Sequence, residues 1–127
     1  MVSALARLPV AGKPTPEVEN WVTHIWEHRG KAGRILDGYT GRKIANALAR
    51  ELRSTLTTAM DHPAEDPKSS LLADQISGAM LSLLRAWIAG RSTATSSDIA
   101  AMLWTGARAL AIANATPYPA LNDDFRV

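Results

Sequence analysis

Two histidines and one glutamate fall within five residues, in the stretch His24-Ile-Trp-Glu-His28. Histidines four positions apart lie on one face of a helix and can bind zinc together, and a glutamate between them can act as a general base. Catalytic zinc also needs a third ligand, and the later acidic residues form no second motif that is placed to supply it. The sequence therefore predicts no bound metal, no cofactor and no enzyme. A zinc hydrolase built on His24, Glu27 and His28 is the least favoured alternative.

The same region offers side chains for a small-molecule pocket. Aromatic rings supply apolar contact area and an imidazole can orient a ligand, while a methionine adapts its shape to varied ligands. The opposite interpretation places the tryptophans and methionines in the core and the histidines in solvent. For Tyr39, the two alternatives are a pocket lid and a surface residue. The pocket candidates are Trp21, His24, Ile25, His28, Tyr39, Leu56, Met60 and Met80.

Length and composition limit the class of protein. The 127 residues suit a single domain over 1–127, with 1–14 and 114–127 predicted to be loose ends. The net charge is +2, without the clustered basic stripe that direct nucleic-acid binding would need. No segment has the features of a secretory signal, and arginines interrupt the windows long enough to span a membrane. We therefore expect a cytoplasmic protein that contacts neither nucleic acid nor membrane by itself.

Helix signals recur along the first half of the chain. Thr15-Pro16-Glu17 predicts a helix start, because a hydroxyl cap, a proline and an acid all suit a first turn. This helix is predicted to run to about Arg29 and to be stopped by Gly30. Further predictions are a short helix at Val2–Leu8, a glycine-bounded bend at Ile35-Leu36 and a long helix at 42–60.

Two more helices are predicted after a proline-containing loop at 61–67. Ser70 is predicted to cap the first of them and Gly90 to end it. Thr95-Ser-Ser-Asp98 is a capping-box variant that predicts the start of the second. No segment shows the alternation of β-branched residues that is typical of strands. The predicted fold is all-α, a helical bundle of four to five helices.

The last two helices, 70–90 and 96–113, carry small or apolar residues almost all the way round, with Arg85 and Arg108 as their only basic residues. A domain of this size has too little interior to bury both of them completely. We therefore expect a homodimer in which the two helices form an intermolecular four-helix interface. The alternative is that the first two long helices cover both faces. The interface candidates are Leu72, Ile76, Ala79, Leu83, Ala86, Trp87, Met102, Leu103, Gly106 and Ala109.

Two segments also carry a family pattern. Trp21-Val-Thr-His-Ile-Trp-Glu-His-Arg29, followed by Arg34-Ile-Leu-Asp-Gly38, is a helix with a His/Glu/Arg-rich end that leads into a short bend. The later segment 72–90 contains an Ile-Ser-Gly-Ala run and an Arg-Ala-Trp-Ile ending. In this order, over roughly Val18 to Ala113, the chain resembles the ligand-binding domains of tetracycline-repressor (TetR) family regulators. The 72–90 segment resembles the first of that family's two dimerisation helices.

The resemblance implies an effector-binding and dimerisation domain of a transcriptional regulator. The C-terminal helix pair would pack against its symmetry mate, and a small apolar molecule bound among the earlier helices would change the dimer geometry. The DNA-reading helix-turn-helix that precedes this domain in the family is not found before Thr15. The chain is thus expected to be a truncated form, a shortened gene product or a domain freed of DNA binding, with weak or no DNA binding of its own. The alternative function is a stand-alone helical module that binds another protein.

Overall fold

The fold is helical throughout the part of the chain that the structure describes. The computed structural model describes residues 1–59 and 67–115, and all regular elements in these ranges are helices, as the sequence predicts. None of these described helices combines the length and hydropathy that crossing a lipid bilayer requires. The elements in chain order are α1 (Val2–Ala6), the 3-10 helix η1 (Leu8–Val10), α2 (Pro16–Glu27), α3 (Arg29–Asp37), α4 (Tyr39–Ala59), α5 (Pro67–Ile88) and α6 (Ser96–Ala115).

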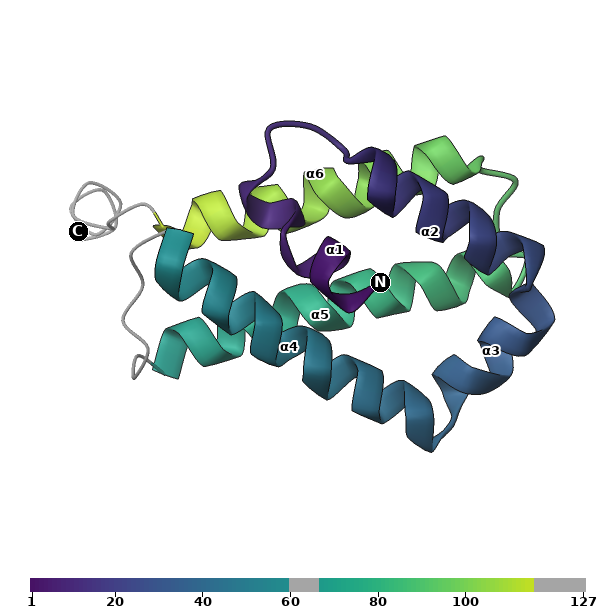
Figure 1. The fold of residues 1–127 in the computed structure, drawn as a ribbon, viewed down its shortest axis with the longest axis horizontal. Helices are drawn as coiled ribbons and strands as arrows, with labels where there is room; N and C mark the ends of the chain where they lie inside the picture. The colour runs from purple at the N-terminus through teal and green to yellow at the C-terminus, as the bar shows by residue number, and fades with distance from the viewer. Residues whose placement is uncertain (60–66, 116–127) are drawn as a thin grey trace, which may run out of the picture.

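Helix α5 runs through the middle of the bundle, with α6 along one side and α4 along the other (Figure 1). Helix α3 also contacts α5, α1 packs against α4, and both α2 and η1 pack against α6. Leu48 and Leu52 of α4 meet Ile76, Leu81 and Leu84 of α5 in one buried cluster. Each such side chain stabilises the fold by about 1.5–3 kcal/mol through burial. The bundle of α4, α5 and α6 is therefore the frame that positions the surface features.

The predicted capping threonines at Thr15 and Thr95 are both confirmed. Thr15 Oγ1 accepts a hydrogen bond from the Val18 N–H at 3.4 Å, ahead of α2. Ahead of α6, Thr95 Oγ1 accepts from the Asp98 N–H at 3.1 Å, and the Asp98 carboxylate accepts from the Thr95 N–H at 3.0 Å. The backbone N–H of Thr95, and then its hydroxyl, stabilise the carboxylate and lower the pKa of Asp98 below its usual value.

The predicted end of α5 at Gly90 is also confirmed. Gly90 has a φ of 82°, a conformation that glycine adopts without the steric cost that a Cβ imposes. Its N–H donates to the Trp87 carbonyl at 3.0 Å, and the Arg91 N–H donates to the Ala86 carbonyl at 3.3 Å. These two bonds satisfy carbonyls that the end of a helix leaves without partners.

The bend predicted at Ile35-Leu36 is wrong, because both residues lie within α3. The chain leaves the helical conformation only at His28 (φ −116°, ψ 31°) and resumes it at once, so Gly30 stops no helix. Leu36 is buried in the core, and its carbonyl accepts a hydrogen bond from Arg85 Nη2 at 3.3 Å. Tertiary contacts of this kind outweigh the low helix propensity of the glycines in α3.

Helix α4 begins at Tyr39, three residues before its predicted start. Gly41, in its first turn, lies directly against the end of α3. A Cβ at Gly41 would be 2.6 Å from the carbonyl carbon of Leu36 and would overlap the carbonyl oxygen. The close approach of α3 and α4 therefore requires a glycine at this position.

Helix α5 also begins earlier than predicted, at Pro67, so Ser70 lies inside the helix and does not cap it. Proline lacks the N–H that a first helical turn leaves unpaired, so it can begin a helix. The prediction counted this proline as part of the loop. The remainder of that predicted loop, 61–66, and the pocket candidate Met60 lie outside the described residues.

Residues 1–14 are not the loose end that the sequence predicts. The short helix is confirmed as α1, and Ala4, Leu5 and Leu8 are all buried. Their apolar side chains have a place in the core because α1 packs against α4 and η1 against α6. The other predicted loose end, 114–127, lies outside the described residues apart from the last turn of α6.

Candidate functional site

A groove lies on the surface between α5 and α6. Its volume is about 160 Å³; exposed Ala79, Met102 and Gly106 stand at its rim, and buried Met80 and Leu103 also line it. Met102 keeps 52% of its surface exposed, although its side chain is long and apolar. The groove thus opens to solvent with an exposed thioether beside small residues.

We call the surface formed by Gly78, Ala79 and Ser82 of α5 with Gly106 and Ala109 of α6 the small-residue face. All five residues are exposed and uncharged. A Cβ placed at either glycine would meet nothing within 4 Å, apart from the backbone of its own helix. Another helix could therefore approach these two helices closely at this face.

Three large polar side chains of α5 and α6, those of Arg85, Trp104 and Arg108, are bonded to the chain's own backbone. Arg85 binds the Leu36 carbonyl, as described above. Trp104 Nε1 and Arg108 Nη1 both donate to the carbonyl oxygen of Ala11, at 2.8 and 3.1 Å. The Arg85 and Arg108 side chains are thus held at the edges of the helix pair, and the small-residue face stays neutral.

The predicted interface residues are divided between the core and the surface. The large ones are drawn into the core because burying them gains the most from the hydrophobic effect. What remains accessible is the groove rim and the small-residue face. Leu72, Ile76, Trp87 and Leu103 are buried, Leu83 and Ala86 are half-buried, and Ala79, Met102, Gly106 and Ala109 are exposed.

The predicted pocket residues are divided in the same way. Ile25, Leu56 and Met80 are buried and fill the core. Tyr39 is 65% exposed at the start of α4. These four residues therefore lie on three helices, α2, α4 and α5, and three of the four are packing residues.

Trp21 and His24 do lie together, on the outer face of α2. With Glu17 and Asn20 they line a shallow hollow of about 350 Å³. The Trp21 indole and the His24 imidazole pack edge to face, with their centroids 5.8 Å apart and an interplanar angle of 86°. This hollow combines an exposed indole with an imidazole, which is the combination expected from the sequence for contact and orientation of a ligand.

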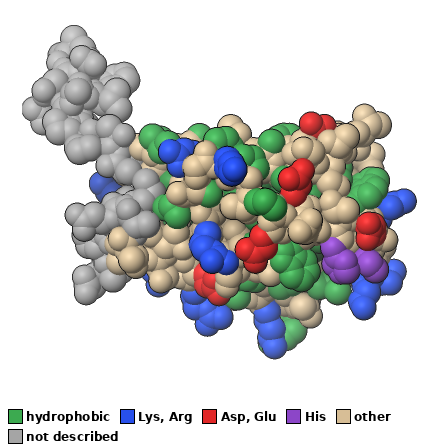
Figure 2. All heavy atoms as spheres, turned by 45° about the horizontal axis from the view of Figure 1, so that its top comes forward, with side chains coloured by type: hydrophobic (Ala, Val, Ile, Leu, Met, Phe, Trp, Pro, Cys, Tyr) green, Lys and Arg blue, Asp and Glu red, His purple; other side chains and the backbone are tan. Residues whose placement is uncertain are grey.

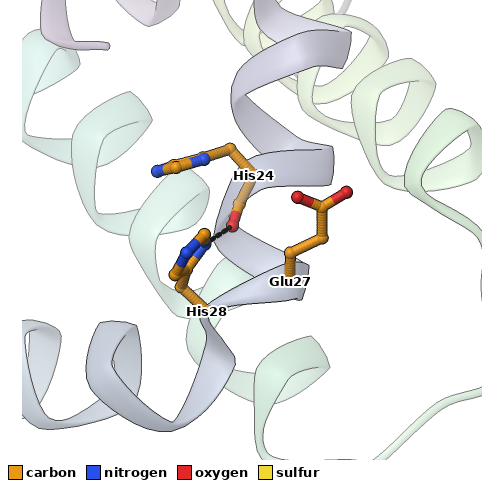
Figure 3. A group of neighbouring side chains, drawn as sticks. All are labelled: His24, Glu27 and His28. Atoms are coloured by element: carbon orange, nitrogen blue, oxygen red, sulfur yellow. Dashed lines mark hydrogen bonds between the residues drawn. The ribbon is translucent and has the colours of Figure 1, made fainter.

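His24, Glu27 and His28 form a group at the end of α2, which we call the histidine group (Figure 3). All three side chains are exposed, and one potential ligand atom of each lies within 4.8 Å of the others. The imidazole centroids are 4.4 Å apart. His28 Nδ1 lies 3.1 Å from the carbonyl oxygen of His24, the contact dashed in Figure 3. Figure 2 shows the described histidines as one surface patch with charged side chains beside it.

A further hollow, at the corner between α3 and α4, was missed by the sequence reasoning. Its volume is about 410 Å³, and Asp37, Tyr39, Arg42 and Arg85 are among the residues that line it. Lys43 Nζ lies 4.8 Å from the centroid of the Tyr39 ring. The Tyr-x-x-Arg-Lys spacing is a readable signal for cations near an aromatic face. The contribution of Arg85, from a distant helix, is not readable from the sequence.

Three surface features therefore stand out on different parts of the bundle: the groove with its small-residue face, the outer face of α2 and the α3–α4 corner. Any function assigned to the chain depends on the geometry of these features. In comparisons with known proteins, no family model, no curated protein and no solved structure matches this chain.

Proposed function

We propose that this chain is the dimerisation and effector-binding domain of a TetR-like transcriptional regulator, with α5 and α6 forming a twofold interface. The observation that carries the proposal is the solvent-open groove between these helices, together with the neutral small-residue face beside it. Each helix pair would pack against the pair of a second copy as a four-helix bundle. The small residues would allow close approach, and Met102 of each copy would fill space in the groove of the other.

The charge pattern of α5 favours a second copy over a different protein. Between Leu71 and Ala89, the charged residues of α5 are Asp74 and Arg85, and both are exposed. The neutral segment 78–82 lies between them. If two copies cross antiparallel at this segment, the Asp74 end of each α5 lies beside the Arg85 end of the other, where the Arg85 guanidinium also binds the Leu36 carbonyl of its own chain. The pattern is thus complementary to itself, as a closed twofold dimer requires.

The hollow on α2 supports the effector part of the proposal. Trp21 is 38% exposed there and offers apolar area beside the polar ring of His24. Helix α2 packs against α6. A small apolar molecule bound at this hollow can therefore shift the position of α6, and with it the geometry of the dimer.

Light scattering on the full chain, over a range of concentrations, tests the interface. We expect a dimer that persists on dilution. Ala79→Glu on α5 and Ala109→Glu on α6 should each weaken it by at least about 100-fold, because two carboxylates would be buried at the interface without partners. Both alanines are exposed in the single chain, so the fold tolerates the changes. Ser54→Glu, at an exposed position on α4, is the matched control and should leave the dimer unchanged.

Two results would contradict the interface. A monomer at every concentration would leave the alternative of a module that binds another protein. A dimer that survives both glutamate substitutions would have its interface elsewhere on the molecule. The effector hollow is tested separately with the fluorescent apolar dye anilinonaphthalene sulfonate, which should bind the wild type better than Trp21→Ala. Equal binding by the two proteins would remove the hollow from the proposal.

A further inference from the structure

The histidine group has the composition of a transition-metal site. Imidazole nitrogens suit zinc, copper and nickel, whereas calcium and magnesium prefer sites made only of oxygen ligands. His24 and His28 are one helical turn apart, and Glu27 adds a carboxylate beside them. The sequence offers no third ligand when the glutamate is assigned the role of general base. In the structure, the carboxylate is near enough to both imidazoles to be that ligand.

The hydrogen bond of His28 prepares this residue for metal binding. Its Nδ1 lies 3.1 Å from the carbonyl oxygen of His24, and a carbonyl can only accept, so Nδ1 carries the proton (Figure 3). The other ring nitrogen, Nε2, is then left with a free lone pair in the neutral ring. Histidines that bind metals commonly donate their second nitrogen to a carbonyl in this way, which fixes both tautomer and orientation.

Arg29, the residue that follows His28, is held against Trp26. The Arg29 guanidinium lies 4.5 Å from the centroid of the Trp26 ring, and its Nη1 donates to the Trp26 carbonyl at 3.1 Å. This arrangement holds the positive charge of Arg29 over the face of the Trp26 indole. A cation at the histidine group would therefore meet the Glu27 carboxylate as its closest charged partner on α2.

We propose that His24, Glu27 and His28 bind one divalent transition-metal ion, of which Zn²⁺ is the type, with water completing the coordination. Zinc ligands lie about 2.0–2.2 Å from the ion, so tetrahedral ligand atoms are about 3.4 Å apart. The potential ligand atoms lie within 4.8 Å of one another, so the widest pair must close by at most about 1.4 Å, which exposed side chains reach by rotation about χ angles. Because Glu27 is a ligand in this site, it is not free to act as a base, and the site binds metal without hydrolytic activity.

The metal site has a structural consequence for the α2–α3 corner. His28 is both the C-cap residue of α2 and the N-cap residue of α3. An ion that links His28 to His24 therefore fixes the residue at which the chain turns from one helix to the next. This inference does not depend on the proposed dimer.

Isothermal titration of the full, chelator-treated chain with Zn²⁺ tests the site. We expect one ion per chain with a dissociation constant below about 100 µM. His24→Ala, His28→Ala and Glu27→Gln should each weaken binding by at least about tenfold. Glu19→Gln on the same helix and His62→Ala are the controls and should bind as the wild type does. All three ligand residues are exposed, so circular dichroism should show an unchanged helix content in each variant.

The titration also contains the results that would overturn the site. These are no binding at 1 mM Zn²⁺, wild-type affinity in the doubly substituted His24→Ala/His28→Ala chain, or one ion per two chains, which would place the metal between molecules. Absorption of the Co²⁺-loaded chain gives a second measurement. Intense visible bands that disappear in His28→Ala support direct ligation, and their persistence contradicts it. Light scattering with and without zinc keeps this outcome separate from that of the dimer.

Discussion

The indole rings of Trp26 and Trp87 stack with their centroids 4.7 Å apart and their planes 24° from parallel. Trp87 Nε1 in turn donates to the carbonyl of Ala94 at 2.9 Å. One pair of rings therefore connects α2, α5 and the segment that leads into α6. Trp87 was a candidate for the dimer interface, and the structure instead uses it to join three parts of a single chain.

Removing the Trp87 ring should therefore destabilise the chain itself. Trp87→Ala is expected to lower the free energy of unfolding by about 3–5 kcal/mol, because it leaves a large cavity. Trp87→Phe keeps an aromatic ring but loses the bond to Ala94, and should cost roughly 1–3 kcal/mol. Urea unfolding followed by circular dichroism measures both. Equal losses in the two variants would contradict separate contributions from stacking and hydrogen bonding.

Two glycines near α3 should respond in opposite ways to the same substitution. Gly41→Ala is expected to lower the free energy of unfolding by about 1–3 kcal/mol, because its Cβ would overlap the Leu36 carbonyl and force α3 and α4 apart. Gly30 lies in a helix, and the Cβ that Gly30→Ala adds would have no neighbouring atom within 4 Å. This substitution should therefore raise the free energy of unfolding by about 0.5–1 kcal/mol. Thermal unfolding of the two variants compares the signs directly. Two changes of the same sign would refute this account of the α3–α4 contact.

The capping box ahead of α6 should make part of the stability depend on pH. The pKa of Asp98 is lowered in the folded chain by its hydrogen bonds to Thr95. A carboxyl with a lowered pKa contributes stability above its usual pKa, and this contribution disappears as the pH falls through the folded value. The difference in unfolding free energy between the wild type and Asp98→Asn should thus be present at neutral pH and shrink in acid. Asp74→Asn, also at an exposed aspartate, is the control; a difference for Asp98→Asn that does not change with pH would contradict the mechanism.

The hydroxyl of Thr95 gives a measurement that does not involve charge. Thr95→Ala removes the bond from the Asp98 N–H and should cost about 1 kcal/mol, the usual value for losing a cap. Thr95→Ser keeps an oxygen at the same position and should recover most of the loss. Denaturant unfolding at neutral pH distinguishes the two. If serine were no better than alanine, the hydroxyl would not be the stabilising group.

The proposed twofold interface also predicts cross-linking. The chain contains no cysteine, so one introduced thiol can pair only with its copy in a second chain. Under mild oxidation, Ala79→Cys should form a disulfide-linked dimer rapidly and Ser82→Cys more slowly, because an antiparallel crossing centred between residues 79 and 80 brings the two copies of position 79 together and sets those of position 82 apart along the helices. Ser54→Cys on α4 should stay monomeric on a denaturing, non-reducing gel over the same period. Slow linkage at both α5 positions would contradict a crossing there.

The features that the sequence predicted correctly depend on local chemistry. A threonine before a proline at Thr15, and a threonine three residues before an acid at Thr95, satisfy helix N–H groups wherever the rest of the chain goes. The error at Ile35-Leu36 has the opposite origin. Glycine propensity predicts a bend there, but burial of Leu36 and its bond to Arg85 come from helices far along the chain, which local patterns do not report.

The interface and pocket predictions were limited by the lack of a clear polar face on the helices. A helix that is apolar nearly all the way round has no clear polar face, so its pattern does not show which side turns to the core. The candidates were chosen partly for bulk, and bulk draws residues such as Ile76 and Leu103 inward. The accessible positions beside the groove are instead mostly small residues, with Met102 as an exposed larger one. For His24 and His28 the spacing alone was sufficient, since neighbours on one helix turn are placed by local geometry.

The shared acceptor at Ala11 has a consequence for how the chain acquires its structure during synthesis. The donors Trp104 and Arg108 follow that carbonyl by 93 and 97 residues. Ala11 is synthesised long before either donor, so these bonds form only after the chain has been made through Trp104 and Arg108. Leu8, which lies in the same segment and packs with η1 against α6, must wait with them. The segment with η1 thus reaches its final contacts only after α6, almost a hundred residues later, has been made.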